Sequence, residues 1–358
     1  MSGKVTMDDI AKRLNVSKSL VSRALSDKYG VSDETRLKIR IEAVNLGYEF
    51  RKSASSRGRS DISDVMVIMA KKSLSDTGYY TKILESIEEA LNRKSIRISL
   101  RFLDSDPEDK DIPIEWSIRS FKTSGIIIVG NISRENISLL MSTGLPVVLV
   151  DVTDPAIPAD RVMTNNFLGM YFGAKYLVDT GHKRILFVGA YNNSVSFMDR
   201  YHGCKYFADN QKAVGVSFRY AIGDYDSRRQ PFNRKELEAM LSRSDLPDAI
   251  LCANDPIAFK IYDMLKERGL RIPEDISVVG FDDVQMCDWV EPKLTSVRSP
   301  KQELGKRAVD MLIRRIRNPD CSFECVQIGT GIAYRDSVCD RSPAKSAAAQ
   351  PEKKPRRA

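Results

Sequence analysis

Long hydrophobic runs are missing from this sequence of 358 residues. The longest apolar stretches, such as Gly125 to Gly130, have the length of a strand, whereas a membrane-spanning helix needs about 20 apolar residues. The opening residues, Met1 to Thr6, also lack the apolar core of a secretion signal. We therefore expect no membrane partner and a cytoplasmic location.

Histidine is rare and the cysteines do not cluster, which argues against metal sites and several kinds of enzyme. The two histidines, His182 and His202, lack the nucleophile and carboxylate spacing of a hydrolytic triad. Six cysteines are scattered along the chain and only Cys321 and Cys325 are close, whereas a tetrahedral zinc site needs four ligands. No phosphate-binding glycine motif is present. We therefore predict no metal, no cofactor and no enzymatic activity.

Positive charge is concentrated at the two ends of the chain. Residues 1–60 contain 13 Lys and Arg against 7 Asp and Glu, and residues 341–358 contain 6 against 1. Since the whole chain carries +8, its long middle is mildly acidic. A basic head on an acidic body favours a polyanion as the partner of the head, and a solvated basic face is the alternative. The tail is rich in Ala, Lys and Pro without leucine heptads, so we predict that it is disordered and that it forms no coiled coil.

The first 50 residues are expected to form a compact helical domain. Thr6 and Asp9 form a capping box, so a helix is expected to begin there with Ile10 and Leu14 on its inner face. Asn15 follows, and it is one of the few residues other than glycine that tolerate the left-handed backbone of a tight turn.

Two more helices are expected after this turn. Ser17 is the predicted N-cap of the second, which runs from Lys18 to Leu25, and a third start lies at residues 31–35. The third helix is expected to direct three side chains toward the common core: Leu37, Ile41 and Val44. Three helices within 50 residues, the second after a short turn, are typical of a helix-turn-helix domain.

These residues resemble the head of the lactose/galactose repressor (LacI) family. The resemblance rests on four motifs at matching spacings: Val5-Thr6-x-x-Asp9-Ile10-Ala11, Val16-Ser17-Lys18-Ser19-x-Val21-Ser22-Arg23-x-Leu25, Val31-Ser32-x-x-Thr35-Arg36 and Leu46-Gly47-Tyr48. The usual turn glycine of the family is replaced by Asn15.

The resemblance implies that the second helix lies in the major groove of DNA. Lys18, Ser19 and Arg23 would then face base edges, where Lys and Arg can donate to guanine. The hydroxyl side chains implied to contact phosphates are Thr6, Ser17, Ser22, Ser32 and Thr35. Ordinary helix capping is the alternative role of these hydroxyls.

The hinge segment, residues 51–61, departs from the family pattern. Members usually continue with Pro-Asn and a short helix whose leucine wedges into the minor groove, whereas here Phe50 and Arg51 replace Pro-Asn. Ala54 is in place, but Arg57 stands where the leucine would be. Two interpretations stay open: Arg57 enters a narrow minor groove, or the segment is a basic linker that touches phosphates. The serines and glycine favour the linker, because they make a weak helix.

From Asp64 onward, apolar runs of strand length alternate with amphipathic stretches. Strands are predicted at residues 65–70, 96–103, 125–129, 146–150, 185–189, 249–252 and 277–281, and helices at 79–93, between 103 and 125, and at 168–180, 201–210 and 256–268. Such alternation predicts parallel sheets with crossover helices. The expected fold class is therefore an all-α helix-turn-helix head plus an α/β body of two doubly wound parallel-sheet lobes.

The family resemblance continues through the body, over roughly residues 4–338. Its landmarks are Gly181-His182-Lys183-Arg184-Ile185, Arg200-x-x-Gly203, Ala253-Asn254-Asp255, Gly280-Phe281-Asp282-Asp283, Pro292-x-Leu294-Thr295-Ser296-Val297 and Arg335-x-Ser337. The resemblance implies a periplasmic-binding-protein-like body in which the chain crosses three times between lobes.

The implied domains are a head (1–50), the hinge (51–61), an effector-binding domain (62–340) and the tail (341–358). Lobe 1 is expected to combine about 62–162 with 293–324, and lobe 2 is expected to combine 163–292 with 325–340.

Four polar side chains are expected to bind a ligand between the two lobes, since each follows a strand or starts a helix: Asp151, Arg200, Asn254 and Asp282. Together they supply the donors and acceptors that vicinal hydroxyls need, and the family uses these positions in this way. Tyr79, Tyr80 and Trp289 are candidates for stacking on the ligand, with core packing as the alternative. A sugar or sugar derivative is the expected effector, and Arg200 would also suit an acidic sugar or a phosphate.

These features predict a sequence-specific transcription regulator, expected to be a repressor. It is expected to bind double-stranded operator DNA as a homodimer and to respond to a carbohydrate. A regulator controlled by a protein partner in place of a metabolite is the alternative. A sugar-processing enzyme and a secreted solute-binding protein would both leave the basic head unexplained.

Overall fold

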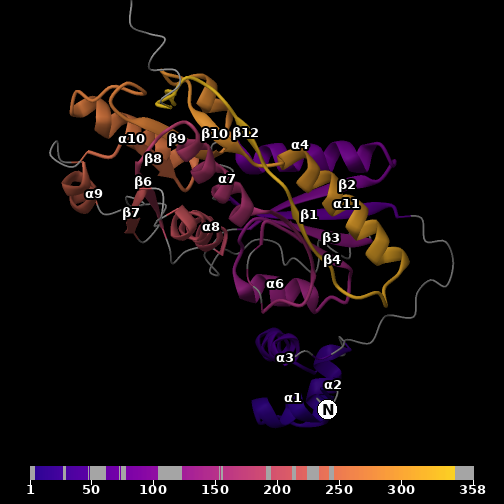
Figure 1. Cartoon of the computed structure of the whole chain (residues 1–358). Coiled ribbons are helices and arrows are strands. Elements are labelled where there is room, and N and C mark those ends of the chain that lie inside the picture. The colour runs from indigo at the N-terminus through magenta and orange to yellow at the C-terminus, as the bar shows by residue number, and fades with distance from the viewer. Residues whose placement is uncertain are drawn as a thin grey trace, which may run out of the picture. The chain divides into compact units, whose positions relative to one another are not determined.

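A computed structural model describes most of the head and the body (Figure 1). The described residues are 5–26, 30–46, 48, 62–71, 73, 78–103, 123–152, 154, 156–190, 195–211, 215–223, 234–241 and 246–342. The hinge with Ala54 and Arg57, the helix predicted between residues 103 and 125, and the tail beyond residue 342 lie outside them.

The head consists of three helices around one small core. They are α1 (Met7–Leu14), α2 (Lys18–Leu25) and α3 (Asp33–Asn45). The buried side chains are Ile10, Ala11, Val21, Ala24, Ile39 and Ala43. On the third helix Ile39 and Ala43 are buried and the predicted Ile41 is only half-buried, whereas the side chains of Leu37 and Val44 lie outside the described part of the structure. Spacing alone could not decide this, because residues 39 and 43 are also one helical turn apart.

Contacts divide the chain into two compact units. The first unit contains Met1–Asp76, Tyr80–Met163 and Lys301–Val326, and the second contains Thr77–Tyr79, Thr164–Pro300 and Gln327–Ala358. The predicted return to the first lobe at residue 293 is therefore too early. The reason is strand pairing, because β10 (Thr295–Arg298) lies beside β9 in the sheet of the second unit.

The first unit has a six-stranded sheet in the order β11-β5-β4-β3-β1-β2. Its strands are β1 (Asp64–Ala70), β2 (Arg97–Leu103), β3 (Gly125–Val129), β4 (Val147–Val150), β5 (Asp160–Thr164) and β11 (Cys325–Ile328). Its helices are α4 (Tyr79–Asn92), α6 (Arg134–Met141) and α11 (Lys301–Arg317). The pairs from β2 through β1, β3 and β4 to β5 are all parallel.

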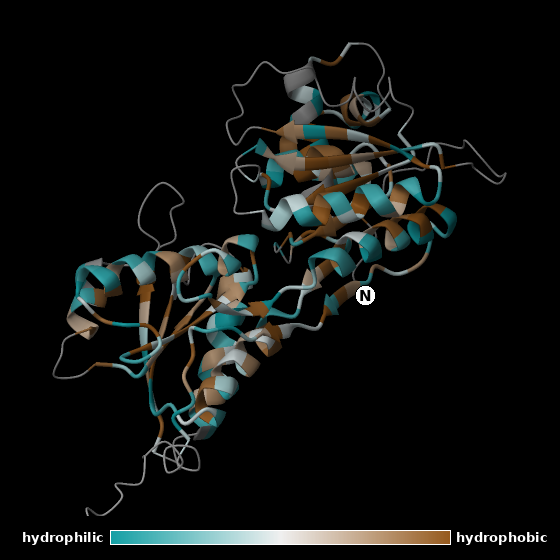
Figure 2. Ribbon diagram, turned by 90° about the horizontal axis from the view of Figure 1, so that it is seen from above, coloured by the Kyte–Doolittle hydropathy of each residue, from teal (hydrophilic) through white to brown (hydrophobic). Residues whose placement is uncertain are grey.

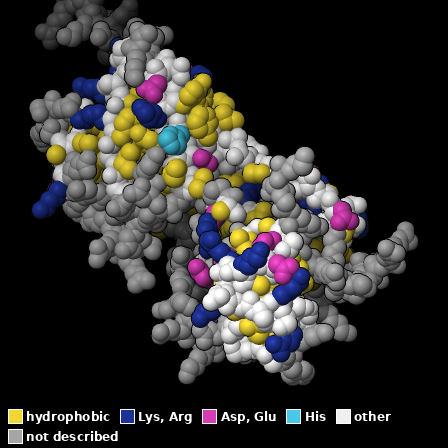
Figure 3. Space-filling view, turned by 90° about the horizontal axis from the view of Figure 1, so that it is seen from below, with side chains coloured by type: hydrophobic (Ala, Val, Ile, Leu, Met, Phe, Trp, Pro, Cys, Tyr) yellow, Lys and Arg dark blue, Asp and Glu magenta, His cyan; other side chains and the backbone are white. Residues whose placement is uncertain are grey.

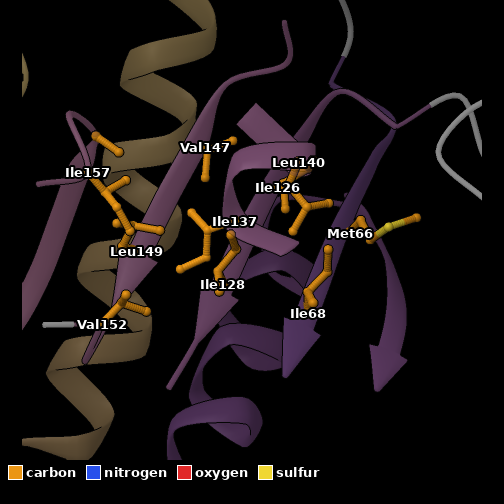
Figure 4. Packing of buried hydrophobic residues seen from close by; sticks show 11 residues of the cluster. Met66, Ile68, Ile126, Ile128, Ile137, Leu140, Val147, Leu149, Val152 and Ile157 are labelled. Atoms are coloured by element: carbon orange, nitrogen blue, oxygen red, sulfur yellow. The ribbon is translucent and has the colours of Figure 1, made fainter. Parts of the chain in front are cut away.

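Alternate side chains of these strands pack on opposite faces of the sheet. Met66 and Ile68 on β1 and Ile126 and Ile128 on β3 meet Ile137 of α6 in one apolar cluster (Figure 4). The residues between them, such as Val65 and Val67, are equally buried on the other face. Strands buried on both faces have nearly continuous apolar sequences, which explains why these runs could be recognised.

The second unit has another six-stranded sheet, in the order β12-β10-β9-β8-β6-β7. Its further strands are β6 (Arg184–Ala190), β7 (Ser217–Gly223), β8 (Ala249–Cys252), β9 (Ser277–Asp282) and β12 (Gly331–Ala333). Its helices are α7 (Asn166–Asp179), α8 (Val195–Gln211), α9 (Arg234–Met240), α10 (Asp255–Glu267) and the 3₁₀ helix η4 (Gln285–Asp288). All pairs are parallel except β10 with β12. The strands are largely hydrophobic, whereas the helices carry hydrophobic and hydrophilic faces (Figure 2).

Candidate nucleic-acid interface and ligand site

The turn between α1 and α2 has the predicted left-handed residue. Asn15 has φ 52° and ψ 46°, and its N–H donates to the carbonyl oxygens at the end of α1. The N–H of Val16 also donates to the carbonyl of Ala11, over 3.0 Å. These bonds satisfy the end of the first helix within three residues, so that the second can begin at Lys18.

The second helix presents polar side chains on its outer surface. Lys18, Ser19 and Arg23 are all exposed, whereas Val21 and Ala24 face the core. Ser17 caps the helix by accepting from the N–H of Leu20 over 3.2 Å. The three side chains predicted to read bases are thus accessible on one short helix, although their contact with DNA stays a prediction.

The hydroxyl side chains of the head act as helix caps. Thr6 accepts from the N–H of Asp9 in a complete capping box. Ser32 accepts from the N–H of Thr35 over 3.3 Å and donates to its hydroxyl over 2.8 Å. Ser22 is half-buried within the second helix. Capping is therefore observed for Thr6, Ser17 and Ser32. The contact of these hydroxyls with phosphates stays a prediction.

Arg36 of α3 holds the far end of the second helix, a contact that sequence reasoning did not find. Its Nη1 donates to the carbonyl oxygens of Ala24, over 3.2 Å, and of Arg23, over 3.4 Å. A cation at the C-terminal carbonyls also favours the helix dipole. The second helix is therefore fixed at both ends, by Ser17 and by Arg36.

In the second unit, Arg200 and Asp282 form a buried ion pair. Nη2 of Arg200 lies 3.0 Å from Oδ1 of Asp282, and Nη1 lies 3.4 Å from Oδ2. Nη1 also donates to the carbonyl of Ala253 over 2.8 Å, which places the guanidinium next to Asn254. Three of the four predicted polar residues thus lie together at the ends of β8 and β9 and on α8.

Three partners of this group were not predicted. Asn166 accepts from Nε of Arg200 over 2.8 Å, and Ser299 donates to Asp282 over 3.0 Å. The guanidinium also lies over the ring of Phe281, 3.8 Å from its centroid. Asn166 and Phe281 are both far from Arg200 in the sequence, so no local pattern around Arg200 could have identified these contacts.

Asn254 has a structural task besides any ligand contact. Its side-chain oxygen accepts from the N–H of Ile257 over 3.0 Å and so caps α10. The amide NH₂ is the part of the side chain that this cap does not use. Asn254 therefore has donors to direct at a ligand oxygen.

A second carboxylate, Asp255, lies just beneath the group and is fully buried. It accepts from the hydroxyl of Ser296 over 2.6 Å and from the N–H of Val284 over 2.9 Å. Burial, followed by repulsion from Asp282, raises the pKa of Asp255 to about 7. A Cβ atom on Gly280 would lie 2.1 Å from the Asp255 carboxylate, so only glycine leaves room for it.

In the first unit, Tyr80 and Asp151 lie together at the ends of strands. The Tyr80 hydroxyl donates to Oδ2 of Asp151 over 3.2 Å, and its ring packs on Gly130. Tyr79 is only 5% exposed and belongs to the core, whereas Trp289 is 70% exposed. Among the aromatic candidates, Tyr80 is thus the one placed beside a predicted ligand residue.

The described residues lack two further features. No helix among them is both long and apolar enough to span a bilayer. In the same part of the chain, no three His, Cys, Asp or Glu side chains converge as a metal site would require.

Two family profiles match the chain. The one described as "Bacterial regulatory proteins, lacI family" covers residues 6–49, and the one described as "Periplasmic binding protein-like domain" covers residues 174–338. The chain thus combines a lacI-family helix-turn-helix domain with a periplasmic-binding-protein-like domain.

Curated relatives match the chain over nearly its whole length. The ribose operon repressor of Haemophilus influenzae is 26% identical over 335 residues, which are 93% of this chain and 98% of the relative. The HTH-type transcriptional repressor PurR of Mannheimia succiniciproducens is 28% identical over 336 residues, with the same two coverages. Among solved structures, the lac repressor dimer bound to operator and the anti-inducer ONPF has a TM-score of 0.62 and 22% identity, covering 94% of this chain and all of that one. This last similarity shows a shared fold.

Proposed function

We propose that the chain is a lacI-family transcriptional repressor that binds operator DNA, responds to a small polyhydroxylated effector and catalyses no reaction. The observation that carries the proposal is the exposure of Lys18, Ser19 and Arg23 on a second helix that Ser17 and Arg36 fix at its ends. A rigid helix with exposed donors is what reading base edges in the major groove requires. Both curated relatives described above are named as repressors.

We further propose that the protein acts as a homodimer in the cytoplasm, where its DNA partner is found. A single helix-turn-helix domain reads only a few base pairs, so two copies on a palindrome extend the site to two half-sites about one helical turn apart. Contact of Thr6, Ser22, Ser32 and Thr35 with phosphates would set the register on each half-site.

The charge balance of the second unit favours a neutral effector. Asp282 already neutralises Arg200, so an anionic ligand would gain little from that guanidinium and would be repelled by the carboxylate. A hydroxyl group, in contrast, both donates and accepts, and it matches the donors of Arg200 and Asn254 and the acceptor oxygens of Asp282. We therefore propose a sugar without acidic groups and assign Asp151 and Tyr80 of the first unit to effector binding as well.

Fluorescence anisotropy of a labelled duplex from the protein's own promoter tests this function. The full-length chain is titrated at two salt concentrations with matched pairs of compounds, such as glucose against gluconate and ribose against ribose 5-phosphate. We expect specific binding that a neutral sugar shifts and that its acidic counterpart leaves unchanged. A response to acids alone would contradict the charge argument. A response only to an added protein from the same cell would favour the partner-controlled alternative.

Two variants connect the response to the site. Asp282→Asn removes the carboxylate that accepts from ligand hydroxyls, so we expect at least a tenfold weaker effector response with unchanged DNA affinity. Asp263→Asn, an exposed acid on α10, is the matched control and should respond like the wild type. Because coupling is reciprocal, operator DNA must change effector affinity by the same factor in any variant that still responds.

A further inference from the structure

Lys18 occupies a position where a positive charge is unfavourable. It is the first residue of α2, directly after the N-cap Ser17, and the first turn of this helix contains no acid. The unpaired N–H groups there give the helix a partial positive charge, which repels an ammonium group. A lysine at this place therefore needs a compensating anion from elsewhere in the fold.

Asp8 of the first helix supplies that anion. Its Oδ2 lies 2.6 Å from Nζ of Lys18, and the side chains of both residues remain exposed, 51% for Asp8 and 61% for Lys18. The neighbouring acid, Asp9, has a different role, because its carboxylate accepts hydrogen bonds from the N–H and the hydroxyl of Thr6 in the capping box. Figure 3 shows one face of the molecule, on which Asp and Glu side chains lie among Lys and Arg side chains.

The pair changes what Lys18 can do at a DNA surface. A lysine on its own is a point charge on a flexible stem, and it can swing from a base edge to the nearest phosphate. Bonded to Asp8, the ammonium group keeps two of its three N–H donors for other acceptors, in directions that the fold sets. The Asp8 carboxylate also repels phosphates, which makes the neutralisation of a phosphate by Lys18 less favourable.

We propose that Asp8 is a positioning residue for DNA recognition, which holds the Lys18 ammonium toward base edges and away from the phosphate backbone. This inference rests on the proposed function. It assigns to the first helix a part in sequence discrimination that the exposed residues of the second helix do not perform alone.

Selection from a pool of random duplexes tests the inference without knowledge of the operator. Full-length wild type, Asp8→Asn, Asp8→Glu and Asp9→Asn are each used to select bound duplexes, which are then sequenced. We expect Asp8→Asn to lose a base preference at one position of each half-site, by roughly fivefold to tenfold. Asp8→Glu keeps the negative charge and should retain the preference. Asp9→Asn removes the same charge one residue away and should also retain it.

The salt dependence of binding provides a second measurement. If Lys18 is released onto a phosphate, the slope of log K against log salt becomes steeper by about 0.9 in Asp8→Asn, on an unrelated duplex as well as on the selected one. In a Lys18→Ala background, the substitution at position 8 should no longer change the preference. Far-ultraviolet circular dichroism of Asp8→Asn and Asp9→Asn controls for helix content, because both variants lose an acid from the first turn of the same helix.

Three outcomes separate the possibilities. Loss of one base preference together with a steeper slope supports the positioning role. Identical selected sequences and slopes for wild type and Asp8→Asn overturn it and leave the proposed function intact. If the wild type selects no sequence at all, the proposed function fails, and this inference fails with it.

Discussion

Asp255→Asn replaces the carboxylate that lies deepest beneath the candidate ligand group. The side chain is fully buried, and its two oxygens accept from Ser296 and from the N–H of Val284. Asparagine has the same shape and no charge. Its oxygen can take the Val284 bond while its NH₂ donates to Ser296, whose hydroxyl can then donate to the carbonyl of Val297, 3.5 Å away. The substitution therefore tests the charge with little change in packing.

The effect on stability depends on pH. The pKa of Asp255 is raised from 3.8 in the unfolded chain to about 7 in the folded protein, mainly by burial. The folded state thus holds a proton that the unfolded state has released, so the contribution of this group to stability is fully present below pH 3.8 and is lost as the pH rises to 7. One pKa unit corresponds to about 1.4 kcal/mol, and the folded-state group is already half ionised at pH 7, so the wild type should lose about 2 kcal/mol of unfolding free energy from this group between pH 5 and 7.

Urea unfolding followed by circular dichroism at pH 5, 6, 7 and 8 measures this effect. Relative to wild type, Asp255→Asn should gain stability as the pH rises from 5 to 7, by about 2 kcal/mol, and the difference should then level off. Asp263→Asn removes an exposed acid from the same helix and is the control for the loss of one carboxylate. If Asp255→Asn differs from wild type by a constant amount, the carboxyl group ionises as easily in the folded protein as in the unfolded one, and the reasoning is refuted.

Two other features of the second unit give predictions. Burial lowers the pKa of His182 below 6.5, so the stability that it provides is fully present above pH 6.5 and is lost as the pH falls. His182→Gln should therefore show a weaker decline in melting temperature between pH 7 and 5 than wild type, whereas the exposed His202→Gln should follow wild type. Gly203→Ala would place a Cβ atom 2.1 Å from the carbonyl oxygen of Phe167, so thermal unfolding should reveal a loss of about 1–3 kcal/mol. Gly329→Ala has open space around its Cβ and should match wild type. Equal melting temperatures for the two alanine variants would show that Gly203 of α8 does not lie against the backbone of Phe167 of α7.

Local signals predicted the head well, because each depends on residues close in sequence. The capping box of Thr6 and Asp9, the N-cap Ser17 and the left-handed Asn15 are all confirmed. Each is a bond or backbone state that involves neighbouring residues, and the side-chain chemistry alone favours it. No such local signal shows which residues of the third helix face the core, because this helix has other apolar residues besides the buried Ile39 and Ala43.

The body was predictable where its strands are apolar on both faces. The strand Gly125–Val129 was predicted with its observed bounds for this reason. β10 and β12, in contrast, are short and contain small or polar residues, and they were not predicted. β10 is placed by pairing with β9, and β12 by pairing with β10. A local sequence pattern does not show such pairing, and for the same reason the second lobe was predicted to end too early.

The candidate ligand residues were found by their position after strands, but the forces that hold them were not. Asp151 and Asp282 have φ values of 55° and 109°, in a region that costs a residue other than glycine about 1–3 kcal/mol. Nothing in the neighbouring sequence indicates this strain. It persists because distant groups bind these side chains, Tyr80 for Asp151 and Arg200 for Asp282. A ligand hydroxyl that bonds to either carboxylate would therefore meet an acceptor whose direction is already set, and less of its binding free energy would be lost in ordering the site.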